Sequence, residues 1–265
     1  MKHWLRQRGL TLVELAIGLL IVSLVAGGGL LVLATQMEQN RIKDTQRALA
    51  SAKEALIGFA QIHGRLPCPA TATSNGQESI FSETTGECSA ALPNNSDVYI
   101  GYLPASTLGL SSVAGGSCEP GGSTFGYLMD KWNRCIRYAV SRASYDAATR
   151  THGIRSAFNT DEGYRPNLRV CRQSTCDDVL VGYPDTATAV VAMVFSTGKN
   201  GPAAGPDEAE NIPPDVDRHF VMTTLRQDGT APGGAFDDIV DWLPKSTLIY
   251  NMAAAGKLPP QQQQP

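Results

Sequence analysis

The sequence predicts an α+β fold in which a long N-terminal helix packs on an antiparallel β-sheet head. Three observations lead to this prediction. An apolar run of 25 residues, 10–34, is followed directly by an amphipathic helical pattern that reaches about residue 63. Beyond it, short β-rich segments alternate with links rich in glycine and proline, which is typical of antiparallel sheets. All six cysteines lie in this second part of the chain.

The apolar run, Leu10 to Ala34, contains a single charged residue, Glu14. As a helix it would be about 37 Å long at roughly 1.5 Å per residue, which is enough to cross a hydrocarbon core of about 30 Å. The nine residues before it include Lys2, Arg6 and Arg8 and no acid, and positive charge stays on the cytoplasmic side of a membrane. We therefore expect residues 1–9 to stay inside and the chain beyond residue 34 to lie outside.

Glu14 is the unusual residue of this segment. A carboxylate in a membrane helix costs about 2.5 kcal/mol or more on insertion scales, so it requires a partner. If the chain is cut after Gly9, Leu10 gains a free α-amine with a positive charge. In an assembly of many copies, Glu14 of one subunit would then meet the amine of the next.

A basic leader, a glycine, one hydrophobic residue and Thr-Leu-Val-Glu-Leu follow one another at residues 1–15. This order resembles the N-terminal signature of type IV pilins and type II secretion pseudopilins. The resemblance implies that a prepilin peptidase, which is also an N-methyltransferase, cuts after Gly9 and methylates Leu10, and that Glu14 is the assembly carboxylate. The family's commonest first residue is phenylalanine, from which leucine departs. The other implied partners are pilin or pseudopilin subunits, an inner-membrane assembly platform and membrane lipid.

The sequence patterns and the resemblance together predict a pilin-like organisation of the chain in five parts. These are a prepilin leader peptide (1–9), a transmembrane and assembly helix (10–34), its amphipathic continuation (35–63), a periplasmic globular head (64–256) and a disordered tail (257–265). The protein would cross the bacterial inner membrane once, with its head in the periplasm, and later enter a pilus or pseudopilus filament.

The apolar run allows two other interpretations. A secretory signal peptide has an apolar core of only about 7–15 residues, so this run is too long for one. A plain membrane anchor fits better, with Glu14 merely near the interface. It leaves the combination of short leader, glycine and early acid unexplained.

The second half of the long helix is predicted from its periodicity. Ile42, Leu49, Ala52, Leu56 and Phe59 are spaced by seven, three, four and three residues, which places them on one helical face. A glycine and two prolines after residue 63 end the helix. We expect the apolar face to cover one side of the sheet.

The head is expected to contain six strands and one short helix. The predicted strands are 98–103, 125–129, 135–140, 179–182, 188–196 and 219–224. Phe236–Trp242 alternates enough for an edge strand or a helix start, with its acids on the surface. Ser246 is expected to cap a short helix that ends near Gly256.

The six cysteines would lie in an oxidising compartment, where an even number predicts disulfides. They are Cys68, Cys88, Cys118, Cys135, Cys171 and Cys176. Six cysteines allow 15 pairings, and the sequence does not choose among them, although the short spacing of Cys171 and Cys176 favours that pair. Zinc binding is the alternative, but the chain has no C-x-x-C and its four histidines are scattered.

Two stretches of the head resemble those of pseudopilins. Asp130–Tyr138 is similar to a D-x-W-G-x-x-x-x-Y hairpin, with Asn133 in place of the glycine, and Phe195–Gly201 is similar to the S-x-G-x-x-G that follows. In major pseudopilins, acidic residues after this point help to bind calcium. The acids here are Asp207, Glu208, Glu210, Asp215 and Asp217, of which Asp207, Asp215 and Asp217 are the calcium candidates. A solvated acidic loop without a cofactor is the interpretation we favour.

The function predicted from these features is that of a structural subunit and not of an enzyme. The chain has no nucleophile elbow, zinc-protease helix or phosphate loop. Its net charge of −3 becomes about −6 once the leader is removed, which disfavours a nucleic-acid partner. The head is large for a major pilin, which suggests a minor subunit. The alternative is a membrane-tethered periplasmic protein that binds a ligand or adheres.

Overall fold

The computed structural model of the protein describes most of the chain between residues 11 and 258. The described residues are 11–79, 82, 87–88, 98–110, 118, 125–142, 147–150, 153–158, 164–185, 187–201, 205–212 and 218–258, without the side chains of 24–32. The chain divides into two compact units, Met1–Lys43 and Asp44–Pro265.

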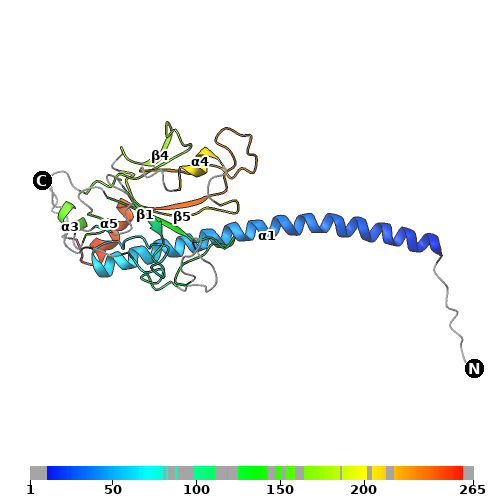
Figure 1. The fold of residues 1–265 in the computed structure, drawn as a ribbon, viewed down its shortest axis with the longest axis horizontal. Helices are drawn as coiled ribbons and strands as arrows, with labels where there is room; N and C mark the ends of the chain where they lie inside the picture. The colour runs from blue at the N-terminus through cyan, green and yellow to red at the C-terminus, as the bar shows by residue number, and fades with distance from the viewer. Residues whose placement is uncertain are drawn as a thin grey trace, which may run out of the picture. The chain divides into compact units, whose positions relative to one another are not determined.

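Helix α1 spans Leu12–His63, which confirms the predicted long N-terminal helix (Figure 1). Within the second unit its predicted apolar stripe is buried: Leu49, Ala52, Leu56 and Phe59 are each at most 8% exposed. The helix ends where Gly64 takes a φ of 72°. A glycine at this position closes a helix without the steric cost that a side chain would bring.

The head is built on a four-stranded sheet, as predicted for an α+β protein with an antiparallel sheet. Its order is β1 (Val98–Tyr102), β2 (Arg137–Ser141), β5 (Val190–Ser196) and β7 (Ile239–Pro244), and every neighbouring pair is antiparallel. Strand β5 lies between β2 and β7 and is buried along its whole length. A strand covered on both faces carries a continuous apolar run, as Val190–Phe195 does.

A second sheet of three strands was not predicted as a separate element. It contains β4 (Val179–Gly182), β3 (Arg169–Cys171) and β6 (His219–Val221), in that order, and β3 pairs with β6 in parallel. Because parallel neighbours need a long crossover, β3 and β6 are far apart in sequence, and β5 lies between them. The two sheets share one core, in which Val170 and Phe220 pack with β5 side chains.

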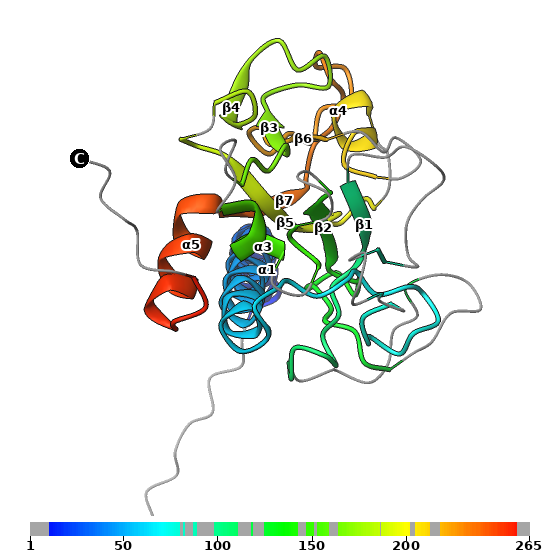
Figure 2. The ribbon, with the colours of Figure 1, turned by 90° about the vertical axis from the view of Figure 1, so that its left-hand side faces the viewer.

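The second half of α1 lies against β7 and helix α5 (Lys245–Ala254), as Figure 2 shows. Lys53 Nζ on α1 donates to both carboxylate oxygens of Asp241 on β7, at 2.8 and 2.7 Å. Gln61 Nε2 donates to the backbone oxygen of Asn251 on α5 at 3.4 Å. These contacts agree with the expectation that the helix covers one side of the sheet.

Two further short helices complete the fold, and two of the predictions for the head are wrong. Helices α3 (Gly153–Phe158) and α4 (Pro206–Ala209) were not predicted. The C-terminal helix α5 does end near Gly256, but Ser246 does not cap it, because the helix starts directly after Pro244 of β7. The predicted strand 125–129 is wrong: Met129 makes only an isolated bridge to Cys135.

The chain forms a turn after Met129, where a strand had been predicted to end. This turn also shows what the aspartate of the Asp130–Tyr138 stretch does. Asp130 Oδ1 accepts the backbone N–H groups of Trp132 and Arg134 at 2.9 and 2.8 Å, and its Oδ2 accepts Ser196 Oγ of β5 at 2.5 Å. Asn133 has a φ of 63°, a left-handed conformation that asparagine tolerates better than most residues. Asparagine can therefore replace the glycine of the resembling motif, whose aspartate has a structural role here.

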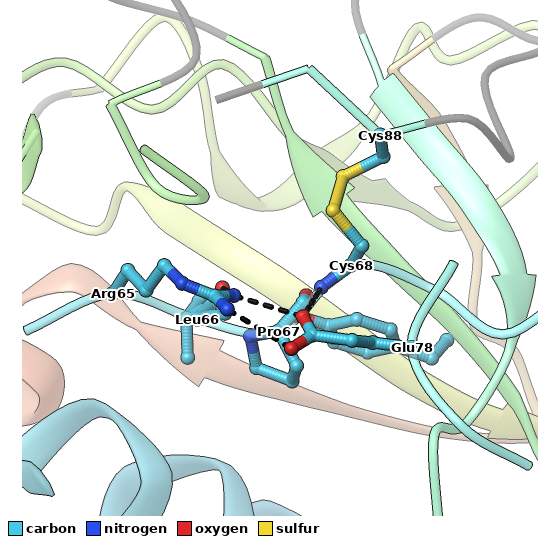
Figure 3. The surroundings of a disulfide bond; sticks show 7 residues. Arg65, Leu66, Pro67, Cys68, Glu78 and Cys88 are labelled. Atoms are coloured by element: carbon cyan, nitrogen blue, oxygen red, sulfur yellow. Dashed lines mark hydrogen bonds and ion pairs between the residues drawn. A yellow bond between two sulfur atoms is a disulfide. The ribbon is translucent and has the colours of Figure 1, made fainter. Parts of the chain in front are cut away.

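Three disulfides pair all six cysteines: Cys68–Cys88, Cys118–Cys135 and Cys171–Cys176. The third confirms the pair that the sequence favoured. Beside the first lies an ion pair between two largely buried side chains (Figure 3). Arg65 donates to both Glu78 oxygens at 2.8 and 2.9 Å, and the same carboxylate accepts the backbone N–H of Cys68 at 3.0 Å.

We predict that the two disulfides Cys68–Cys88 and Cys171–Cys176 contribute unequally to stability. Their cysteines are separated by 20 and 5 positions, so replacing each pair by alanine should lower the free energy of unfolding by about 3 and about 2 kcal/mol. Urea unfolding of the full-length protein in detergent measures both. A larger loss from the shorter loop, or free thiols in untreated protein, would contradict this prediction.

Candidate functional site

The start of α1 carries a reciprocal set of hydrogen bonds between Thr11 and Glu14. The Thr11 hydroxyl accepts the backbone N–H of Glu14 at 3.3 Å, and Glu14 Oε2 accepts the backbone N–H of Thr11 at 3.1 Å. The hydroxyl also donates to Glu14 Oε2 at 2.9 Å. The Thr11 carbonyl accepts the backbone N–H of Leu15 at 3.1 Å, which is the first bond of the helix. This is a capping box, formed by a threonine and a glutamate three residues later.

The helix that follows exposes apolar side chains. Between residues 12 and 22, seven leucine, isoleucine and valine residues beyond Leu12 are 54–66% exposed, and Leu12 is 87% exposed. A contiguous apolar surface of this kind indicates contact with lipid or with other protein. Within the described part of the chain, no helix has a stretch that is both long enough and apolar enough to cross a membrane.

The other two predicted N-terminal residues, Gly9 and Leu10, lie outside the described residues. Their proposed roles as cleavage residue and methylated residue therefore depend on the sequence alone. Of the predicted processing and assembly residues, Glu14 is the one whose side chain the structure describes.

The three calcium candidates from the sequence do not form one group in the described structure. Asp207 lies in α4, and its Oδ2 accepts Arg226 Nη2 at 2.7 Å while its Oδ1 accepts the backbone N–H of Ser174 at 2.9 Å. Its charge is thus compensated by an arginine. Asp215 and Asp217 lie outside the described residues.

A different set of acids does come together in the head. Carboxylate oxygens of Glu208, Asp237 and Asp238 all lie within 4.8 Å of one another. Glu208 comes from α4, and the two aspartates come directly before β7. Since Glu208 is 0% and Asp238 3% exposed, the expectations of a solvated loop and of surface acids are wrong at these positions. We call Glu208, Asp237 and Asp238 the acidic cluster.

Asparagines and backbone amides hold the acidic cluster. Asn200 Nδ2 donates to both Glu208 oxygens at 3.1 and 3.2 Å, and Asn211 Nδ2 donates to Asp238 Oδ2 at 2.8 Å. The backbone N–H of Asp237 donates to Glu208 Oε1 at 2.7 Å. Asp237 Oδ2 in turn accepts the backbone N–H of Asn200 at 3.1 Å. One strand end and one short helix are thus tied together through their acids.

Two oxygens of the acidic cluster are buried and accept no hydrogen bond from the described residues, Asp237 Oδ1 and Asp238 Oδ1. The pKa of Asp238 is raised to about 8, mainly by burial and also by the charges of Glu208 and Asp237, against the lowering effect of the Asn211 hydrogen bond. Burial likewise raises the pKa of Asp237. The charge of Arg134 lowers the pKa of Asp237, but burial outweighs this effect.

These residues fit a hard divalent cation. Calcium takes about six to eight oxygen ligands at about 2.3–2.6 Å, largely from carboxylates and carbonyls. The acidic cluster offers three carboxylates, two of them with an oxygen free to bind. A cation there would supply positive charge and hold the start of β7 against α4.

Sequence reasoning missed Asp237 and Asp238 because a pair of acids before an alternating segment usually points to solvent. The signal that was present is the neighbouring segment Phe195–Gly201, which the resemblance had already connected with calcium. A Cβ at Gly198 within it would overlap the Asp237 side chain, so that this turn must approach the aspartate closely.

Comparison with known proteins identifies one segment. Residues 4–30 match the family described as the prokaryotic N-terminal methylation motif. No curated protein and no solved structure matches the chain significantly. The motif implies processing by a peptidase and assembly with other pilin subunits, and the proteins that carry it are structural. Residues 4–30 are thus the prepilin-type motif of type IV pilins and pseudopilins, which confirms the resemblance found in the sequence.

Proposed function

We propose that this protein is a minor structural subunit of a type IV pilus or a type II secretion pseudopilus. It is made as a prepilin, cleaved after Gly9, methylated at Leu10 and assembled through α1. The observation that carries the proposal is the methylation motif at residues 4–30, combined with a helix that exposes its apolar side chains around Glu14.

Before assembly, residues 10–34 anchor the subunit in the inner membrane, with the head in the periplasm. The basic leader supports this orientation, because lysine and arginine favour the cytoplasmic side. The peptidase then removes the leader on that side and leaves a positive amine on Leu10. The assembly platform draws the subunit into the filament from this state.

Assembly replaces lipid around α1 by the helices of neighbouring subunits. In that apolar surrounding a carboxylate without a partner costs several kcal/mol. Glu14 meets this requirement by pairing with the amine of Leu10 in a neighbour, which also sets the position of one subunit along the next. The large head, residues 64–256, supports a minor subunit, and a tethered ligand-binding or adhesive protein is the alternative.

Replacing Gly9 by valine should block maturation, because the peptidase site requires a small, flexible residue before the cut. The uncleaved precursor should accumulate, and electrophoresis with N-terminal sequencing would detect it. N-methyl-leucine at the terminus of the wild-type protein would support the assignment. A mature product of Gly9→Val at the wild-type level would refute it.

Replacing Glu14 by valine or glutamine should separate cleavage from assembly. In the membrane-bound subunit the acid sits near the interface, so its loss should leave insertion, cleavage and head folding intact. In the filament its loss leaves the Leu10 amine unpaired among apolar helices. The cleaved variant should therefore accumulate in the membrane, as measured by its ratio to filament-associated protein. Normal incorporation of Glu14→Val would favour the plain anchor instead.

A second function, cation binding by the head, is favoured by the acidic cluster. Asp237 Oδ1 and Asp238 Oδ1 are buried and accept no hydrogen bond from the described residues, and the three carboxylates of the cluster repel one another when all are ionised. Arg134, whose charge acts on Asp237, approaches the cluster from the Gly201 side. Calcium would offset the repulsion and stabilise the head, as the resembling pseudopilin stretches suggest.

We predict that calcium stabilises the full-length protein in detergent. At about a hundred times its dissociation constant it should raise the unfolding temperature by about 5–10 °C over that in EDTA. Asp238→Asn should abolish this increase, yet should be no less stable than the wild type in EDTA, because asparagine has the size of the neutral acid that the raised pKa of Asp238 favours. Calorimetry in both buffers measures the two effects.

Asp228→Asn is the matched control, because Asp228 is an exposed acid in a turn with Thr230. This variant should respond to calcium as the wild type does. If calcium has no effect on the wild type, or if Asp238→Asn responds fully, the acidic cluster does not bind the cation.

A further inference from the structure

Thr11 places the carboxylate of Glu14 before any neighbour is present. Both its backbone N–H and its hydroxyl donate to the same oxygen, Glu14 Oε2, at 3.1 and 2.9 Å. The hydrogen bonds that the described residues make to this carboxylate all end on Oε2. The second oxygen, Oε1, is left to an outside donor. The glutamate side chain is exposed, so such a donor can reach it.

This arrangement survives the proposed cleavage. The N–H group that holds Oε2 belongs to the peptide bond between Leu10 and Thr11, which remains intact when the chain is cut after Gly9. The hydroxyl is part of the Thr11 side chain and is equally unaffected. The mature subunit can therefore keep Glu14 in the orientation that the capping box gives it.

We propose that Thr11 is a positioning residue for assembly, which holds Oε2 of Glu14 and so presents Oε1 to the amine of a neighbouring subunit. This inference depends on the proposed function. A free glutamate side chain populates many rotamers and must lose that freedom when it forms a defined ion pair. Thr11 orders the carboxylate in the lone subunit, so the pairing step does not have to order it.

Three substitutions of Thr11 separate positioning from simple helix capping. Thr11→Val and Thr11→Gly both remove the hydroxyl, but glycine is still an acceptable N-cap residue and valine is not. Thr11→Ser keeps both the hydroxyl and the capping ability. We expect the valine and glycine variants to show an about fivefold lower ratio of filament-associated to membrane-associated protein. Thr11→Ser should match the wild type. Only cleaved protein is counted, in cells that carry the assembly machinery, so that a change in processing does not enter the ratio.

Glu14→Gln tests whether the effect of Thr11 on assembly requires the Glu14 carboxylate. If Thr11 acts through the carboxylate, Thr11→Val combined with Glu14→Gln should be no worse than Glu14→Gln alone. Ser23→Ala is the matched control, since its hydroxyl bonds the Leu20 carbonyl of the same helix and not Glu14. It should assemble normally.

The outcomes distinguish this inference from the proposed function. Wild-type incorporation of Thr11→Gly, together with poor incorporation of Glu14→Gln, would overturn the role of Thr11 and leave the role of Glu14 standing. Additive losses in the double variant would overturn it as well. Normal incorporation of Glu14→Gln would instead remove the basis of the proposed function.

Discussion

A carboxylate taken out of water requires a partner, and much of this protein is arranged to supply one. Glu78 pairs with Arg65, Asp207 with Arg226, and Asp241 with Lys53, and each of these ion pairs connects two separate segments of the head. Asp130 shows that a cation is not required, since two backbone N–H groups and the Ser196 hydroxyl bind both of its oxygens. Glu14 and the acidic cluster differ from these acids. In each of them, at least one carboxylate oxygen accepts no hydrogen bond from the described residues.

Glu14 and the acidic cluster differ in their burial and in how their acids are brought to their partners. Glu14 is exposed, and its one bound oxygen is held by Thr11, only three residues away in sequence. The acidic cluster has two buried members and one half-buried member and combines residues about 30 positions apart, so long-range folding must bring its acids together. Such an arrangement persists when a proton or a cation offsets the repulsion. A neighbouring amine and a divalent cation are the partners that we propose for these two sites.

Features encoded locally were predictable from the sequence, and features created by long-range pairing were not. The period of Leu49, Ala52 and Leu56 identified the buried face of α1, and the spacing of Cys171 and Cys176 identified their disulfide. Strand β3 has only three residues, and its parallel partner β6 is distant in sequence, so no local pattern marks it. The acidic cluster was missed for the same reason: Asp238 resembles a surface acid until α4 is folded against it.

Strand β7 connects the acidic cluster to the part of α1 that belongs to the head. The cluster lies directly before its first residue, Asp241 in its middle binds Lys53, and α5 follows it without a loop and contacts Gln61. Strand β7 is paired with β5 from Ile239 to Pro244, so the residue next to Asp238 and the residue that binds Lys53 belong to one paired strand. The acidic cluster and the attachment of α1 to the head are thus connected through the backbone of one strand.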